Sequence, residues 1–178
     1  MSAPIVLALE RCVLRPWRAG DERALAKHAN DREVWRNLRD AFPHPYTEDD
    51  ARSWIALCGQ TEAVQLAIEV DGEPSGGIGL QRRADVHRLT AEIGYWLGRG
   101  AWGRGIATEA VRALSSHGLE ALGLERIEAH VFAWNRASMR VLEKCGFARE
   151  GWLRRAALKD GELIDCALYA RCRDERAG

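Results

Sequence analysis

The chain has 178 residues, and its 26 Lys and Arg balance 26 Asp and Glu, so its formal net charge is zero. This length predicts one domain over residues 1–178, and the charge balance argues against broad binding to nucleic acid or to a membrane surface. The sequence contains no 18-residue apolar run and no leader-like start, so we expect a soluble, cytoplasmic protein. The five cysteines are scattered without a C-x-x-C pair, which predicts neither a disulfide framework nor a metal site.

The N-terminal third is expected to form one strand followed by helices. Residues 5–17 (IVLALERCVLRPW) predict an opening strand that ends at its proline. Asp21 is placed to cap a helix over 21–30, and a second short helical piece is expected over 31–40. A Thr-x-x-Asp pattern resembles a capping box and predicts a further helix over 47–58.

The middle of the chain predicts three strands and a helix. Two strands within 63–83 are joined at Asp71-Gly72, which is a hairpin turn signal. Residues 88–98 (RLTAEIGYWLG) alternate between apolar and other side chains, as a half-buried strand does. Apolar residues over 106–122 recur at helical spacing.

The C-terminal third predicts a strand over 126–134, a helix that Asn135 caps, and two closing strands around Asp160-Gly161. The chain is therefore expected to form a mixed α/β domain. Its central, mostly antiparallel, twisted sheet would have about seven strands, one parallel strand–helix–strand unit and flanking helices.

The stretch GRGAWGRGIATEA, residues 98–110, contains four glycines between the predicted strand and helix. A glycine-rich turn into a helix presents free backbone N–H groups and the positive end of the helix dipole, which together favour an anion such as phosphate. Side chains in place of Gly103 and Gly105 would block a diphosphate, and Arg99 and Arg104 can add positive charge at the rim.

Other phosphate motifs fit this stretch less well. The G-x-x-x-x-G-K-[ST] loop of nucleotide triphosphatases is absent. Gly98-x-Gly100-x-x-Gly103 matches a dinucleotide-binding fingerprint, so a nicotinamide-dependent oxidoreductase is an alternative. This match follows an antiparallel run, and no acidic residue ends the next strand, both of which disfavour that alternative.

Four motifs within residues 92–147 point to a known family: EIGYWL, WGRGIATEA, LGLERIEAHV and NRASMRVLEKCGF. With them, and with CVLRPWRAGD and DCALYA outside that range, the chain resembles the GNAT superfamily of N-acetyltransferases, in the branch of the ribosomal-protein N-terminal (alanine/serine) acetyltransferases. The resemblance implies that acetyl-CoA is the co-substrate, without a metal, and that backbone amides of the glycine stretch hold its diphosphate. The cofactor-binding residues implied are Trp96, Leu97, Arg99, Trp102, Gly103, Arg104, Gly105, Ile106, Ala107, Thr108 and Asn135. Gly100 departs from the superfamily, which usually has Gln or Arg there.

The resemblance also suggests the catalytic residues. Leu142 replaces the tyrosine that protonates the leaving thiolate in many relatives, so Ser138 is the first candidate for that role, with Asn135 beside it. Alternatively, Ser138 serves only the helix N-terminus. Glu92 is the first candidate for the base and His130 the second, unless Glu92 forms a structural ion pair with an arginine.

The expected reaction is direct transfer of an acetyl group to a primary amine, most favourably a protein N-terminal α-amine. An α-amine with a pKa of about 8 is roughly a tenth neutral at pH 7, and therefore needs less help from a base than lysine does. A small-molecule amine (polyamine, antibiotic or amino-acid-like) and a non-catalytic acyl-CoA-binding module are the alternatives. A homodimer is an alternative to a monomer. The candidate substrate-binding residues are Trp35, Phe42, Tyr46 and Trp54.

Overall fold

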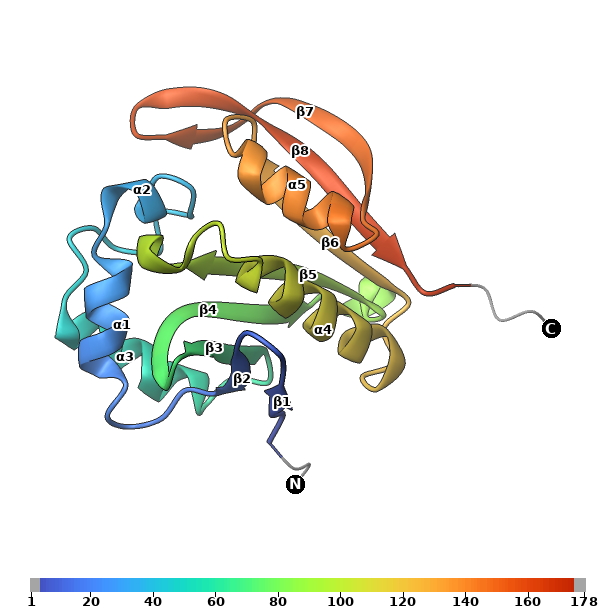
Figure 1. Cartoon of the computed structure of the whole chain (residues 1–178). Coiled ribbons are helices and arrows are strands. Elements are labelled where there is room, and N and C mark those ends of the chain that lie inside the picture. The colour runs from blue at the N-terminus through green and yellow to red at the C-terminus, as the bar shows by residue number, and fades with distance from the viewer. Residues whose placement is uncertain (1–3, 175–178) are drawn as a thin grey trace. The chain divides into compact units, whose positions relative to one another are not determined.

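The computed structural model describes residues 4–174, in which strands and helices follow the mixed α/β order expected (Figure 1). The strands are β1 (Leu7–Ala8), β2 (Val13–Pro16), β3 (Val64–Val70), β4 (Glu73–Arg82), β5 (Thr90–Leu97), β6 (Arg126–Phe132), β7 (Ala148–Lys159) and β8 (Glu162–Cys172). The α-helices are α1 (Glu22–Ala29), α2 (Arg32–Trp35), α3 (Glu48–Cys58), α4 (Ile106–Glu120) and α5 (Arg136–Lys144), and the 3-10 turns are η1 (Asp85–His87) and η2 (Arg99–Ala101).

The strand order in the sheet is β1-β2-β3-β4-β5-β6-β8-β7. The backbone contacts divide the chain into two compact units. Unit 1 comprises the residues up to 79 together with 95–110, and unit 2 comprises 80–94 together with the residues from 111 on. The expectation of one domain over residues 1–178 stays a prediction.

The opening segment is a hairpin, and the prediction of one strand over residues 5–17 was wrong. β1 pairs antiparallel with β2 through Leu7 and Leu14, and β2 continues the sheet by pairing Leu14 with Ile68 of β3. The carboxylate of Glu109 in α4 accepts hydrogen bonds from the backbone N–H groups of Glu10 and Arg11, at 3.2 and 2.9 Å. This contact stabilises a turn that contains no glycine, and the additional strand gives the described sheet eight strands rather than about seven.

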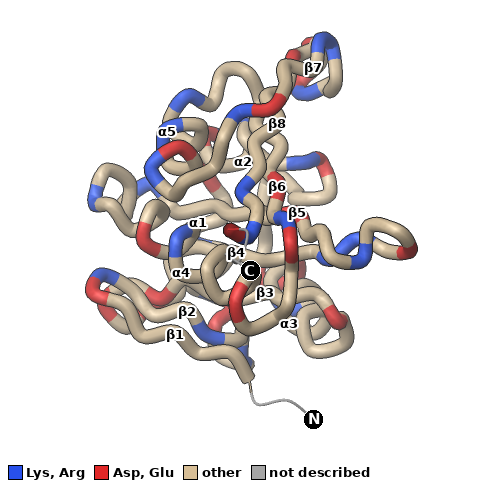
Figure 2. Tube along the Cα trace, turned by 90° about the vertical axis from the view of Figure 1, so that its right-hand side faces the viewer, with Lys and Arg blue, Asp and Glu red and all other residues tan. Residues whose placement is uncertain are grey.

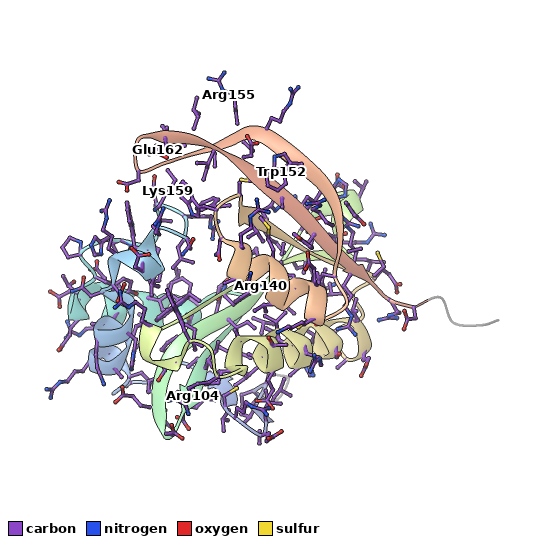
Figure 3. The ribbon with its side chains drawn as sticks, turned by 45° about the horizontal axis from the view of Figure 1, so that its top comes forward. Arg104, Arg140, Trp152, Arg155, Lys159 and Glu162 are labelled. Atoms are coloured by element: carbon purple, nitrogen blue, oxygen red, sulfur yellow. The ribbon has the colours of Figure 1, made fainter. Side chains whose placement is uncertain are left out.

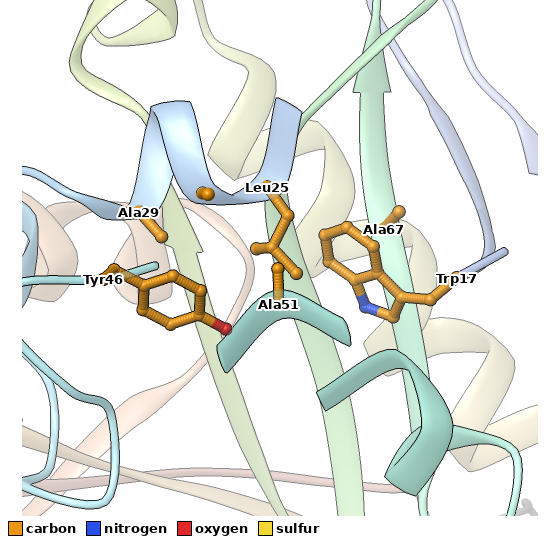
Figure 4. Packing of buried hydrophobic residues seen from close by; sticks show 7 residues of the cluster. Trp17, Leu25, Ala29, Tyr46, Ala51 and Ala67 are labelled. Carbon is orange, nitrogen blue, oxygen red and sulfur yellow. The ribbon is translucent and has the colours of Figure 1, made fainter. Parts of the chain in front are cut away.

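α1 and α3 pack together over the sheet of unit 1 around an apolar cluster (Figure 4). The Thr47 and Asp50 capping box predicted for α3 is confirmed, since each side chain accepts from the backbone N–H of the other. The buried members of the cluster are Trp17, Leu25, Ala26, Ala29, Tyr46, Ala51 and Ala67.

Asp21 precedes α1 as expected, but its side chain forms no capping hydrogen bond in that helix. The carboxylate instead accepts two hydrogen bonds from the Arg15 guanidinium, at 2.7 and 2.9 Å, while Arg15 Nε donates to Glu69 at 2.6 Å. Arg15 and Asp21 are both buried. A buried guanidinium is stable only when paired, so Asp21 stabilises the start of the sheet through Arg15.

In unit 2, β5 and β6 form the predicted parallel pair, with Ala91 opposite Ile127 and Glu92 opposite Glu128. One face of β6 is covered by helices, because α4 approaches Ile127 at Gly118. The same face of β8 carries Tyr169, which donates a hydrogen bond to Glu143 of α5. Residues at the alternate positions of β5 and β6 therefore lie on the opposite face of the sheet.

β7 and β8 form a long antiparallel hairpin, and α5 runs alongside it (Figure 1). β7 is the last strand of the sheet, and its pairing shifts twice, between Arg149 and Gly151 and between Leu153 and Ala157. At the second shift Arg155 has φ 51°, and its side chain projects away from the ribbon (Figure 3).

Lys and Arg are interspersed with Asp and Glu along the trace, so neither sign is gathered in one long segment (Figure 2). Among the helices that the structure describes, none is long and apolar enough to span a membrane. The expected cytoplasmic location stays a prediction.

Candidate active site

The glycine stretch forms a tight turn between β5 and α4 in unit 1. After η2 the backbone passes through Gly103 at φ 74° and Gly105 at φ 77°, and α4 begins at Ile106. L-residues rarely adopt such positive φ values, which explains the glycines on both sides of Arg104.

The backbone of this turn has enough open space beside it to accept a diphosphate. A Cβ atom at Gly103 would meet no described atom within 4 Å, so the backbone surface at that residue is open. The first N–H groups of an α-helix lack partners within the helix, and its dipole favours negative charge. The residues from Trp102 to Thr108 could therefore hold the diphosphate of acetyl-CoA through backbone N–H groups.

The two arginines expected at the rim are each near a carboxylate of unit 1. Arg99 Nε lies 3.4 Å from Asp31, and Arg104, which is labelled in Figure 3, donates to Asp71 at 3.2 Å. Both guanidinium groups are about half exposed, with side-chain exposures of 58% and 49%. Such exposed pairs are weak, so either arginine can exchange its carboxylate for a phosphate.

The end of β5 is held in place by side chains around it. The indole N–H of Trp102 donates to the carbonyl oxygen of Leu97 at 2.6 Å. The next residue, Gly98, packs against the ring of His28, where a Cβ would lie 2.7 Å from Nδ1. Trp96 and Leu97 thus stand at a well-supported strand end, while their expected pairing with pantetheine stays a prediction.

Glu109 places a carboxylate in the first turn of α4, close to the proposed anion site. Its contacts with the N–H groups of Glu10 and Arg11, and with the Arg11 guanidinium at 3.6 Å, offset that negative charge. Burial, followed by the nearby Glu109, raises the pKa of the Cys12 thiol to about 11. Cys12 is therefore a protonated structural thiol at neutral pH.

In unit 2, Asn135 caps α5 as predicted, and its Oδ1 accepts from the backbone N–H of Ser138 at 3.1 Å. Asn135 itself therefore satisfies this helix N–H. Met139 and Leu142 are the buried residues of α5, so Leu142, at the position of the usual tyrosine, serves the core.

Glu92 projects from the face of β5 opposite to the helices, together with His130 of β6. Glu92 Oε1 lies 3.4 Å from His130 Nδ1, and the two side chains are 43% and 34% exposed. The expected alternative for Glu92 was an ion pair with an arginine, but the partner found here is a histidine. The neighbouring Glu128 instead contacts the guanidinium groups of Arg83 and Arg126.

The four candidate substrate-binding aromatics all lie in unit 1 but in different surroundings. Phe42 contacts Tyr46 and Trp96, with ring centroids 4.8 and 5.5 Å apart. Tyr46 is buried, which raises the pKa of its phenol, and Trp54 packs against the same cluster. Trp35 instead stacks near His44 at 5.6 Å. Their part in substrate binding stays a prediction.

Two supporting contacts were missed by sequence reasoning. His28 against Gly98 and Glu109 against the β1–β2 turn join residues far apart in the chain, and no short motif marks either pair. The contact of Glu92 with His130 was also missed, although the alternation along each strand places both residues off the buried face.

Comparison with known proteins agrees with this arrangement. A family model described as an acetyltransferase (GNAT) domain matches residues 11–148. An uncharacterised N-acetyltransferase p20 of Bacillus licheniformis is 34% identical, covering 97% of this chain and 98% of the relative. The ribosomal-protein-serine acetyltransferase of Escherichia coli K12 is 37% identical, covering 73% of this chain and 74% of the relative. The structure of Mycobacterium smegmatis RimJ in complex with CoA-disulfide superposes with a TM-score of 0.84 at 28% identity, covering 97% of this chain and 89% of that chain.

The chain belongs to the GNAT acetyltransferase family. It is an acetyl-CoA-dependent acetyltransferase whose relatives include ribosomal-protein acetyltransferases. These findings favour acetyl transfer over the oxidoreductase and the non-catalytic binding module considered from the sequence.

Proposed function

We propose that the enzyme acetylates the α-amine at the N-terminus of a protein. The observation that carries this proposal is the glycine turn into α4, which has positive φ at Gly103 and Gly105 and whose backbone is open at Gly103. The choice of acceptor is supported by the likeness to the ribosomal-protein-serine acetyltransferase of E. coli and to RimJ.

Acetyl-CoA supplies an acetyl thioester, and the chain's own residues bind, orient and exchange protons. The backbone from Trp102 to Thr108 binds the diphosphate, with Arg99 and Arg104 at its rim. Asn135 fixes the start of α5, from which Ser138 donates a hydrogen bond to the departing thiolate. Glu92 supplies the carboxylate that promotes loss of a proton from the amine.

The acceptor follows from the cost of deprotonation. An α-amine, with a pKa of about 8, and a lysine side chain, at about 10.4, differ by roughly 3 kcal/mol in the cost of reaching the neutral form at a given pH. A solvent-exposed carboxylate is a weak base, so the site favours the more acidic ammonium group. Trp35, Phe42, Tyr46 and Trp54 are proposed to line the path of the acceptor. We also propose that the enzyme acts in the cytoplasm, as a monomer or a homodimer.

The test is acetylation of a panel of amines by the purified full chain with acetyl-CoA, read by mass spectrometry. The panel contains peptides that begin with serine or alanine, the same peptides with a blocked N-terminus and an internal lysine, and small polyamines and amino acids. We expect the mass of one acetyl group on the free N-termini and none on the blocked peptides.

Transfer to polyamines or amino acids, without transfer to any peptide, would replace the protein acceptor with a small molecule. A Ser138→Ala variant tests the role of the hydroxyl group alone, because it keeps the backbone N–H that donates a hydrogen bond to Asn135 Oδ1. A lower kcat with unchanged affinity for acetyl-CoA is expected, whereas wild-type kcat would remove Ser138 from the mechanism.

A further inference from the structure

Glu92 and His130 form an exposed pair on the face of the sheet that α4 and α5 leave uncovered in unit 2. The two residues come from neighbouring parallel strands, in whose register Glu92 lies opposite Glu128, two residues before His130. Glu92 Oε1 lies 3.4 Å from His130 Nδ1. About a third or more of each side chain is exposed, so solvent and a dissolved amine can reach the pair.

The neighbouring charges explain why Glu92 is matched with the histidine. Glu128 lies beside Glu92 in the parallel register, but it contacts Arg83 and Arg126. The charge of Glu128 is therefore offset by two guanidinium groups. Glu92 keeps a carboxylate oxygen against the imidazole of His130.

We propose that Glu92 and His130 act as one proton-accepting pair, in which His130 Nε2 takes the proton of the acceptor ammonium group and Glu92 holds the ring through Nδ1. This inference rests on the proposed acetyl transfer to an amine. His130 is then the catalytic base and Glu92 its positioning residue. The carboxylate favours the tautomer with hydrogen on Nδ1, which leaves Nε2 as the acceptor.

An imidazole is in general a better-matched acceptor for the proton of an amine than a carboxylate is. Transfer from an α-ammonium group to an ordinary imidazole is uphill by roughly 1.5 pKa units, and to an ordinary glutamate by roughly 3.5.

The atoms balance without a further reactant. The ammonium group gives one proton to His130 Nε2, and the neutral nitrogen then forms a C–N bond to the acetyl carbon as the C–S bond breaks. The nitrogen loses its second proton in forming the amide. Of the two protons, one ends on the thiol of coenzyme A and the other is released to solvent.

Other charged groups near the pair bear on its pH dependence. On β6, Glu128 and Arg126 share the face of His130, and Arg126 also donates two hydrogen bonds to Glu150 of β7. On β8, the residue in register with His130 is the uncharged Leu168.

The experiment measures kcat and KM against pH for wild type, Glu92→Gln, His130→Gln and the double variant. The acceptors are peptides that begin with serine or alanine, thiol release gives the rate, and isothermal titration gives the affinity for acetyl-CoA. His87→Gln and Glu120→Gln are matched controls, because both residues are exposed and lie outside the site.

At neutral pH we expect each single variant to lose about 100-fold in kcat, with the affinity for acetyl-CoA unchanged. The loss should shrink toward about pH 9, where solvent already deprotonates the α-amine. The double variant should be no slower than the slower single variant, because the two groups work as a unit. The control variants should match wild type.

A His130→Gln variant as fast as wild type across the pH range would overturn the pair, and so would losses that multiply in the double variant. In both cases, acetylation of the peptides by the wild type would still support the proposed function. A wild type that binds acetyl-CoA and acetylates no amine would instead refute the proposed function, and the pair with it.

Discussion

Replacing Gly103 by alanine tests whether the glycine turn binds the cofactor. Gly103 has φ 74°, and an added Cβ would meet no described atom within 4 Å, so the cost to folding is backbone strain without a clash. A left-handed conformation costs an L-residue about 1–2 kcal/mol. For a chain of this size that corresponds to a fall in Tm of about 2–8 °C.

Gly123, in the turn between α4 and β6, offers a matched control. It has φ 67°, and its Cβ would likewise meet no described atom within 4 Å. Gly103→Ala and Gly123→Ala should therefore lose similar Tm in the absence of ligand. In isothermal titration with acetyl-CoA, only Gly103→Ala should bind about tenfold more weakly or worse, a change of about 1.4 kcal/mol. Wild-type affinity in Gly103→Ala, or an equal loss in Gly123→Ala, would refute the assignment of the turn.

Three further substitutions test contacts described above. Asp21→Ala leaves the buried Arg15 guanidinium with an incomplete set of partners, so the free energy of unfolding in urea should fall by about 3 kcal/mol. A change below about 1 kcal/mol would mean that the Arg15–Asp21 pair contributes no more than a surface ion pair. A backbone N–H and an indole N–H of β7 lower the pKa of Asp165 below its ordinary value of 3.8. Wild type should therefore have a higher free energy of unfolding than Asp165→Asn above pH 3.8, and this difference should disappear as pH falls through the lowered pKa. A difference that persists in acid would contradict this origin. Thr47→Ala and Asn135→Ala should each lower the free energy of unfolding by about 1 kcal/mol, because both remove a helix cap. The affinity for acetyl-CoA should fall only in Asn135→Ala. Equal affinities in the two variants would mean that Asn135 serves only as a cap.

Most strands and helices could be predicted because their signals are local. The Asp71-Gly72 turn, the alternation along β5 and the capping box of α3 each depend on residues within a few positions of one another. The glycine turn was likewise recognisable, because the positive φ at residues 103 and 105 favours glycine, which is visible in the sequence.

The features that escaped prediction depend on partners far apart in the chain. The β1–β2 turn is held by Glu109, nearly a hundred residues away, so it needs no glycine or proline of its own. Asp21 has the position of a cap, but a buried arginine competes for its carboxylate. The pairing of Glu92 with His130 requires the parallel register of β5 and β6, which no local pattern specifies.

The irregular pairing of β7 has a consequence for the protein in concentrated solution. An exposed edge strand is a template on which a second chain can add by hydrogen bonding. β7 is twelve residues long and ends the sheet, but its two register shifts break the row of evenly spaced backbone groups. Arg149, Arg154 and Arg155 add like charges along the same strand. An approaching copy of β7 would meet both a mismatched backbone and electrostatic repulsion, so we expect sheet extension at this edge to be disfavoured.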